Sequence, residues 1–299
     1  MRWILGACCL VLIGAGVYFG SGFIEKEEAA TTPEAGTQNT ATTTPEEPQG
    51  DPNDLLPDIV PLPARDVRLV TRPDGALMLL FSTTYYNQGL GNAELIADPA
   101  KKGIKSDHER AVLQRIYRKD GTYRDKEVGT FLWHQEHLHY HFSDFITYDL
   151  EAVDAPLSID LSGQSVKATY CLRDVSRVDM PLENRKEEAD YKICGKERQG
   201  ISVGWADSYF YNFPGQALNI SDLKTGTYRL TFIANPDNKL EEMRYQNNRS
   251  SIVFKLDMEN KTVEVLERIP SQTPRIDHVH LEQPLGTGGY DTIAPSDVE

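Results

Sequence analysis

The middle of the chain alternates short apolar stretches with turn signals, and none of it shows the 3.6-residue period of an amphipathic helix. The stretches are rich in β-branched, aromatic and leucine residues, as strands are. They span residues 66–71, 76–87, 111–118, 167–172, 227–234 and 251–258. Turns such as Asp-Gly and Asn-Pro-Asp-Asn separate them. Many short strands with frequent turns predict an all-β fold, here an antiparallel β-sandwich with long loops.

The start of the chain has a different pattern. Residues 3–24 form an uncharged and mostly apolar run, which is long enough to cross a bilayer as a helix. Arg2 precedes the run and Glu25 follows it, so the positive-inside rule places the remaining chain outside the cytoplasm. Residues 1–24 are therefore predicted to be a single transmembrane helix that anchors the protein in the membrane. The alternative is a cleaved signal peptide, which would leave the protein secreted or periplasmic.

Composition divides the remaining chain into three parts. Residues 25–54 consist largely of Thr, Pro, Glu, Ala and Gly, and they have too few large apolar side chains to form a core. They are predicted to be a disordered acidic stalk. Residues 55–268 contain the predicted strands and form the folded domain. Residues 269–299, rich in Pro, Gly and Asp, are predicted to be a loosely ordered tail.

The chain has 299 residues and a formal net charge of −14. Nine acids and one lysine between Glu25 and Asp58 account for −8 of that charge. The folded domain is nevertheless acidic. An acidic surface argues against nucleic-acid binding and favours basic partners or amines.

The four cysteines fall into two groups. Cys8 and Cys9 lie inside the apolar run, which leaves Cys171 and Cys194 for the folded domain. Two cysteines 23 residues apart in an exported domain most simply form one disulfide. Two free thiols are the alternative.

Residues 131–142, FLWHQEHLHYHF, contain four of the seven histidines. His137, His139 and His141 alternate with other residues, so on a strand they point to one face. His134 would face away on a regular strand and could support the site from outside. Imidazole ligands without a carboxylate or thiolate suit copper or zinc, and the spacing does not choose between them. Residues i and i+4 of a strand lie about 13 Å apart, so a strand whose three histidines share one ion has to bend.

The segment WHQEHLHYHFSDFITYDL, residues 133–150, closely resembles the copper-binding segment of lysyl oxidases. Four further stretches resemble other parts of that family in the same order. They are LLPDIVP (55–61), KATYCLRD (167–174), QGISVGWADSY (199–209) and GTYRLTFIANPDNKLEEMRYQNN (226–248). Each match alone is modest, but together they cover most of residues 55–256.

The resemblance implies copper bound by His137, His139 and His141. It also implies a lysine tyrosylquinone cofactor formed from Lys167 and Tyr209. The implied reaction is the oxidative deamination of primary amines, peptidyl lysine among them, to aldehydes. Molecular oxygen would be consumed, and ammonia and hydrogen peroxide would be released. Without the resemblance, Lys167 would be interpreted as an ordinary strand lysine and Tyr209 as a core tyrosine.

The reaction also needs a general base that removes the α-proton of the substrate. Asp207, two residues before Tyr209, is one candidate, and His134 is another. A carboxylate serves better as this base if burial raises its pKa. The other interpretation of Asp207 is a hydrogen-bonding role at the end of a strand.

The end of the resembling region also implies a calcium site. The expected ligands are Asp58, Glu242, Asn247 and Asn248, and oxygen ligands of this kind suit calcium. Arg244 stands where the family would have an acid, and its charge would repel the ion. The alternative is a hydrogen-bonded turn.

The chain departs from the animal enzymes at several positions. Glu136 stands where they have a cysteine, and Thr147 stands where they have a histidine. Cys171 and Cys194 match two family cysteines whose usual partners are absent. These departures and the stalk suggest a microbial relative.

Two other functions compete with an amine oxidase. A non-catalytic extracellular β-sandwich could bind copper or zinc through the histidines, but it would need neither Lys167 nor Tyr209. A cupin-type metal enzyme would need a nearby glutamate and a distant partner histidine, which the sequence does not offer. The expected partners are therefore a primary amine or a lysine-containing protein, molecular oxygen and, through residues 1–24, a membrane.

Overall fold

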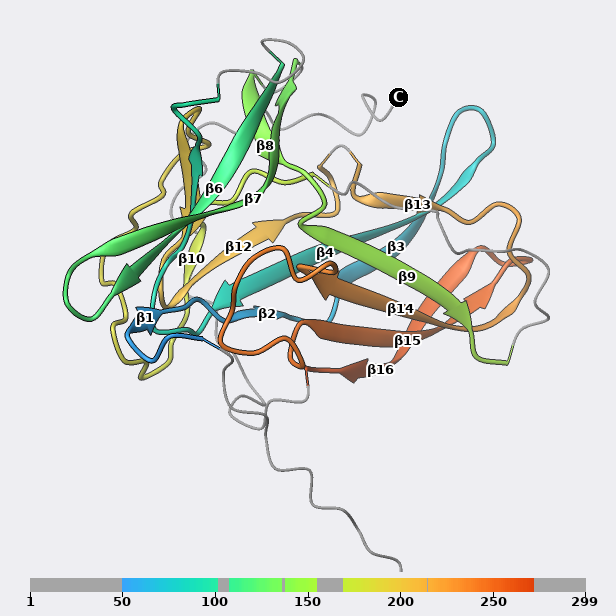
Figure 1. Ribbon diagram of the computed structural model, residues 1–299. Coiled ribbons are helices and arrows are strands. Elements are labelled where there is room, and N and C mark those ends of the chain that lie inside the picture. The colour runs from blue at the N-terminus through green and yellow to red at the C-terminus, as the bar shows by residue number, and fades with distance from the viewer. Residues whose placement is uncertain (1–49, 102–107, 136–137, 155–168, 214, 272–299) are drawn as a thin grey trace, which may run out of the picture. The chain divides into compact units, whose positions relative to one another are not determined.

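The computed structural model describes residues 50–101, 108–135, 138–154, 169–213 and 215–271 (Figure 1). This part contains sixteen strands and no helix, and every ladder between strands is antiparallel. The predicted all-β antiparallel fold is confirmed. The expected membrane helix at residues 1–24 lies outside the described residues. Within them, nothing forms a helix with the length and apolar character to span a membrane.

The strands form three sheets. The first contains, in spatial order, β11 (Arg198–Ile201), β5 (Ala93–Ala97), β6 (Glu109–Arg118), β7 (Tyr123–His134) and β8 (His139–Phe142), with β1 (Asp54–Leu55) on β6. The second contains β10 (Ser176–Arg177), β12 (Trp205–Tyr209), β4 (Leu77–Asn87) and β13 (Ala217–Asn219), with β2 (Ile59–Pro61) and β3 (Arg65–Thr71) also on β4. The third contains β16 (Thr262–Ile269), β15 (Arg249–Asp257), β14 (Gly226–Ala234) and β9 (Ile146–Ala152).

One apolar core joins the three sheets. Tyr85 of β4 packs edge-on against Phe145 and against Phe232 of β14, with ring centroids 5.1 and 6.3 Å apart. Phe131 of β7 and Phe142 of β8 are fully buried in the same core. β4 is buried along nearly its whole length, which explains why its first five residues, 77–81, are all apolar rather than alternating with polar ones.

The predicted strand at 167–172 is wrong over its described part. Only Tyr170 pairs, in an isolated bridge with Phe142. The backbone N and O of Cys171 both bond to the hydroxyl group of Tyr209 instead. A strand needs these groups for a neighbouring strand, so side chains have replaced the ladder here.

Candidate metal and cofactor site

The β7–β8 hairpin carries the described histidines that the sequence selected. His139 and His141 are two residues apart on β8, so their side chains share one face of the strand. Their Nε2 atoms lie 2.9 Å apart. His141 is buried and His139 is partly buried, so the two imidazoles converge on one shielded point.

His134 belongs to the same cluster, contrary to the expectation that it faces away. Its ring stacks on that of His141, with centroids 4.7 Å apart and planes at 25°. The expectation assumed one regular strand through the histidines. Instead Leu138 has a φ of 53°, in the left-handed region, and β8 begins at His139. The chain reverses before β8, so His134 pairs directly with His139 across the hairpin.

The histidine pair fits a copper ion by its donor chemistry. Imidazole nitrogen is a good ligand for copper and for zinc. The hydroxyl group of Thr169 lies 3.4 Å from Nδ1 of His141, and such a contact orients the ring while Nε2 stays directed at His139. His137, the third expected ligand, lies outside the described residues. The structure therefore brings two of the three expected ligands together.

A disulfide joins Cys171 to Cys194, as predicted. Both sulfur atoms and a ring nitrogen of His139 lie within 4.8 Å of one another. Cys171 is almost fully buried. The disulfide therefore packs beside the histidines and ties two loop segments to them.

Tyr209 is buried on β12, and its hydroxyl group is held by the backbone of Cys171. The hydroxyl oxygen accepts a hydrogen bond from Cys171 N and donates one to Cys171 O, each at 2.9 Å. The Tyr209 ring meets that of Tyr170 nearly at right angles, with centroids 4.5 Å apart. Cys171 thus links Tyr209 to the histidine side of the disulfide. Lys167, the expected cofactor lysine, lies outside the described residues.

Asp207 lies two residues before Tyr209 on β12 and is completely buried. Its Oδ2 accepts hydrogen bonds from the Tyr85 hydroxyl group at 3.0 Å and from the backbone N of Arg173 at 3.2 Å. Burial raises the pKa of Asp207 to about 7, although the positive charge of Arg173 opposes that shift. This carboxyl group can therefore change its proton occupancy near neutral pH.

Gln199 organises the site, and the sequence analysis did not single it out. Its Nε2 donates to the carbonyl oxygens of Tyr140, at 2.6 Å, and Gly195, at 3.1 Å. Its Oε1 accepts from the backbone N of Leu172 at 3.3 Å. Tyr140 lies between His139 and His141, Gly195 follows Cys194, and Leu172 follows Cys171. Gln199 is uncharged and its described partners are backbone groups, so only its place in the resembling segment marked it.

Comparison with known proteins agrees with this geometry. The family profile described as lysyl oxidase matches residues 117–266. The chain belongs to the lysyl oxidase family. The matched residues include the β7–β8 hairpin, the disulfide, Asp207 and Tyr209.

Vertebrate members of the lysyl oxidase family match part of this chain. Lysyl oxidase homolog 2B of Danio rerio is 34% identical over 119 residues, which is 40% of this chain and 14% of that protein. Lysyl oxidase homolog 4 of Mus musculus is 31% identical over 124 residues, with shares of 40% and 14%. Lysyl oxidase homolog 3 of Homo sapiens is 30% identical over 129 residues, with shares of 43% and 16%. The chain therefore spans only about a seventh of the length of these relatives.

The four expected calcium ligands of this lysyl oxidase family member also lie together, and we call them the carboxylate–amide cluster: Asp58, Glu242, Asn247 and Asn248. Asn247 donates from Nδ2 to Asp58 Oδ1 at 2.7 Å, and Asn248 donates to Glu242 Oε1 at 2.9 Å. Among the described residues, the side-chain oxygens of both asparagines have no hydrogen-bond partner.

The two acidic residues of this cluster differ in whether a positively charged side chain pairs with them. Arg244 forms an ion pair with Asp58. Glu242 has no cationic partner in the described part of the chain, and its carboxylate accepts hydrogen bonds from Ile59 N at 2.6 Å and Asn235 Nδ2 at 2.7 Å. Burial raises the pKa of Glu242 to about 8, against these hydrogen bonds.

Proposed function

We propose that this protein is a copper-dependent amine oxidase. It converts primary amines, peptidyl lysine among them, to aldehydes, consumes oxygen, and releases ammonia and hydrogen peroxide. One observation carries the proposal: the converging imidazoles of His139 and His141 lie beside the Cys171–Cys194 disulfide, and the backbone of Cys171 holds the buried Tyr209 hydroxyl group. A protein that only stored metal would need neither Lys167 nor Tyr209.

The residues have separate roles in this proposal. His137, His139 and His141 hold copper, and Lys167 and Tyr209 together form the quinone. When present, copper and the quinone supply the electron sink for amine oxidation and the route of electrons to oxygen. The chain itself positions these groups and keeps water from Tyr209, which is only 6% exposed.

Asp207 is the proposed proton acceptor. With a pKa of about 7, a large fraction of its carboxyl groups is ionised at neutral pH and can take the α-proton of the amine. Its hydrogen bonds to Tyr85 and Arg173 fix the carboxylate. Asp207 and Tyr209 alternate on β12, so both side chains leave the same face of that strand.

The proposed substrates and location follow from charge and disulfide chemistry. A net charge of −14 attracts protonated amines and basic protein segments. A disulfide in the folded domain fits a compartment outside the cytoplasm. We propose that residues 1–24 bring the domain there, either as an anchor or as a cleaved signal.

The test uses the full chain prepared with copper. We expect a quinone absorbance, a cross-linked peptide whose mass joins Lys167 to Tyr209, and peroxide formation with primary amines. Tyr209→Phe should lose all three, whereas the exposed Tyr123→Phe should keep them. An uncross-linked peptide and no peroxide would overturn the proposal, and copper binding alone would favour a non-catalytic metal-binding module.

We also propose calcium for the carboxylate–amide cluster. Two carboxylates and two buried amide oxygens without partners in the described structure form an oxygen-rich group suited to that ion. Arg244 pairs with Asp58 in the absence of the ion. Calcium would therefore have to displace the guanidinium group.

A further inference from the structure

The sulfur atoms of the disulfide lie close enough to His139 to form a candidate second metal site. His139, Cys171 and Cys194 each place a potential ligand atom within 4.8 Å of the other two. As a disulfide, the two sulfur atoms are bonded to each other and are poor ligands. As thiolates, they are strong ligands for soft cations.

We propose that the dithiol form of this protein binds a thiophilic cation such as Zn²⁺ through Cys171, Cys194 and His139. Two thiolates and one imidazole are typical of zinc, with the fourth position open to water. Zinc–sulfur bonds of about 2.3 Å place the two sulfur atoms of a tetrahedral site roughly 3.8 Å apart. The Cα atoms of the two cysteines lie 5.7 Å apart, so side-chain rotation can provide this separation without backbone movement.

Gln199 keeps the three ligands together when the disulfide is open. Its side chain bonds to the backbone of Tyr140, next to His139, and of Gly195, next to Cys194. It also bonds to the backbone of Leu172, next to Cys171. Gln199 is completely buried, so water does not compete for these bonds. The backbone segments that carry the three ligands are therefore held together by contacts other than the bond between the sulfur atoms.

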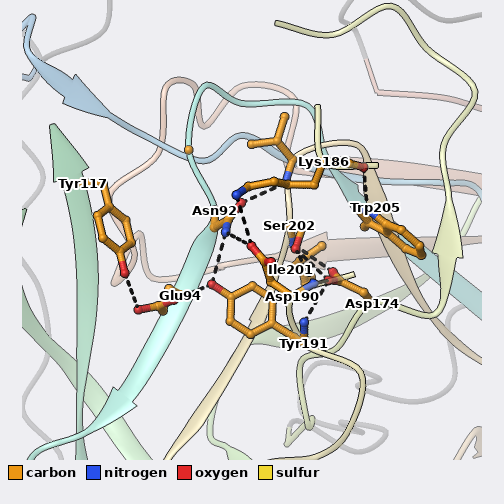
Figure 2. A network of polar contacts seen from close by, with 12 residues as sticks. Asn92, Glu94, Tyr117, Asp174, Lys186, Asp190, Tyr191, Ile201, Ser202 and Trp205 are labelled. Atoms are coloured by element: carbon orange, nitrogen blue, oxygen red, sulfur yellow. Dashed lines mark hydrogen bonds and ion pairs between the residues drawn. The ribbon is translucent and has the colours of Figure 1, made fainter. Parts of the chain in front are cut away.

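A polar network fixes the loop that carries Cys194 (Figure 2). The Asp174 carboxylate accepts hydrogen bonds from the backbone N of Asp190, at 2.9 Å, and of Tyr191, at 3.1 Å. It also accepts from Ser202 N at 2.8 Å and from the Ser202 hydroxyl group at 2.7 Å. The Tyr191 hydroxyl group donates to Glu94 on β5 at 2.6 Å. This network anchors the loop a few residues before Cys194 without using the disulfide.

The two forms of the protein would use His139 differently. In the dithiol form, His139 serves the thiolate site and is lost to the proposed copper site. An external disulfide can reverse this state: it takes two electrons from the thiolates and two protons from water and becomes two thiols, the Cys171–Cys194 bond forms, and the cation leaves. Disulfide closure therefore has to precede copper loading.

The experiment compares both forms of the full chain carrying Cys8→Ser and Cys9→Ser, which leaves only Cys171 and Cys194 as cysteines. A phosphine reduces one sample and is removed, and Co²⁺ is titrated into both. We expect one equivalent of Co²⁺ to give thiolate-to-cobalt charge-transfer absorbance in the reduced sample only. Zn²⁺ should abolish that absorbance and protect both thiols from a thiol reagent.

Variants assign the ligands. In the reduced sample, Cys194→Ser and His139→Ala should each weaken Co²⁺ binding by more than about tenfold, because even loss of a residue that merely orients a ligand costs 10- to 100-fold. His108→Ala, at a histidine outside the cluster, is the matched control and should bind like the parent. Near-ultraviolet circular dichroism follows the fold of the reduced chain.

Three results would overturn this inference. They are absence of the charge-transfer band in the reduced sample, its presence in the oxidised sample, or loss of the fold on reduction that Zn²⁺ does not prevent. Each leaves the copper-oxidase proposal standing, because that proposal concerns the oxidised protein and is read out as peroxide. Failure of the oxidase test would likewise leave the cobalt result unchanged.

Discussion

Two buried carboxyl groups, Asp207 beside Tyr209 and Glu242 in the carboxylate–amide cluster, show how nearby charges change the effect of burial on a pKa. Burial raises the pKa of both, to about 7 and about 8. The charge of Arg173 opposes the shift at Asp207, whereas the charge of Asp58 adds to the shift at Glu242. At neutral pH, Asp207 can exchange a proton, while Glu242 is mostly protonated. The same physical cause thus lets Asp207 exchange a proton near neutral pH and makes the unfolding free energy depend on pH through Glu242.

The largest expected effect is the loss of catalytic rate caused by Asp207→Asn. If Asp207 accepts the α-proton, the substitution should lower kcat by about 10²- to 10⁴-fold. The parent rate should rise as pH increases through about 7, because the ionised carboxylate is the base, and the variant should lack this rise. Peroxide release over a pH series measures both. An unchanged pH profile would show that Asp207 has only a structural role.

Glu242→Gln should change stability rather than catalysis. The folded-state pKa is raised from 4.5 to about 8, so the stabilising contribution is full below about 4.5 and is lost as pH rises through about 8. The parent should lose on the order of a few kcal/mol of unfolding free energy over this range. The variant should lose less, as measured by urea unfolding at several pH values. Equal slopes for the two proteins would contradict the shifted pKa.

Thr169→Val tests whether the Thr169 hydroxyl group orients the imidazole ring of His141. Valine keeps the shape but removes the hydroxyl group that lies 3.4 Å from His141 Nδ1. Copper affinity should fall by about 10- to 100-fold. Competition with a coloured chelator measures the change, and Thr122→Val, at an exposed turn, is the control. Unchanged affinity would mean that His141 does not need this contact.

The smallest effect is expected from calcium on Arg244→Gln. Removing the guanidinium group leaves Asp58 without its ion-pair partner, so calcium should stabilise the variant more than the parent. At a concentration of 10 times Kd, the gain would be about 1.4 kcal/mol. Because calcium favours ionised Glu242, the gain should grow as pH rises through about 8. Thermal unfolding with and without calcium measures it, and no gain in either protein would remove calcium from this cluster.

The sequence predicted the regular strands better than the irregular ones. β4, β14 and β15 were visible because burial on one or both faces imposes an apolar pattern on the chain. The stretch at 167–172 has the same composition, but in its described part the backbone of Cys171 and Leu172 bonds to side chains rather than to a neighbouring strand. Composition alone does not distinguish these two cases.

Within the candidate site, the sequence identified residues with distinctive chemistry and missed those with only geometric roles. His139, His141 and the disulfide were found from residue type and spacing. The inward position of His134 follows from its cross-strand pairing with His139, and Leu138, just before β8, has a left-handed conformation that leucine rarely adopts. Gln199 acts through three backbone groups that no sequence pattern reveals.

The isolated bridge between Phe142 and Tyr170 helps to hold the strand that carries His139 and His141. β8 is an edge strand, and two hydrogen bonds of 2.7 and 3.0 Å close its outer side at Phe142. Side chains alternate along a strand, so a slip of β8 by one residue would turn His139 and His141 to the opposite face. The β7–β8 ladder and this bridge together hold the register that keeps His139 and His141 on one face of β8.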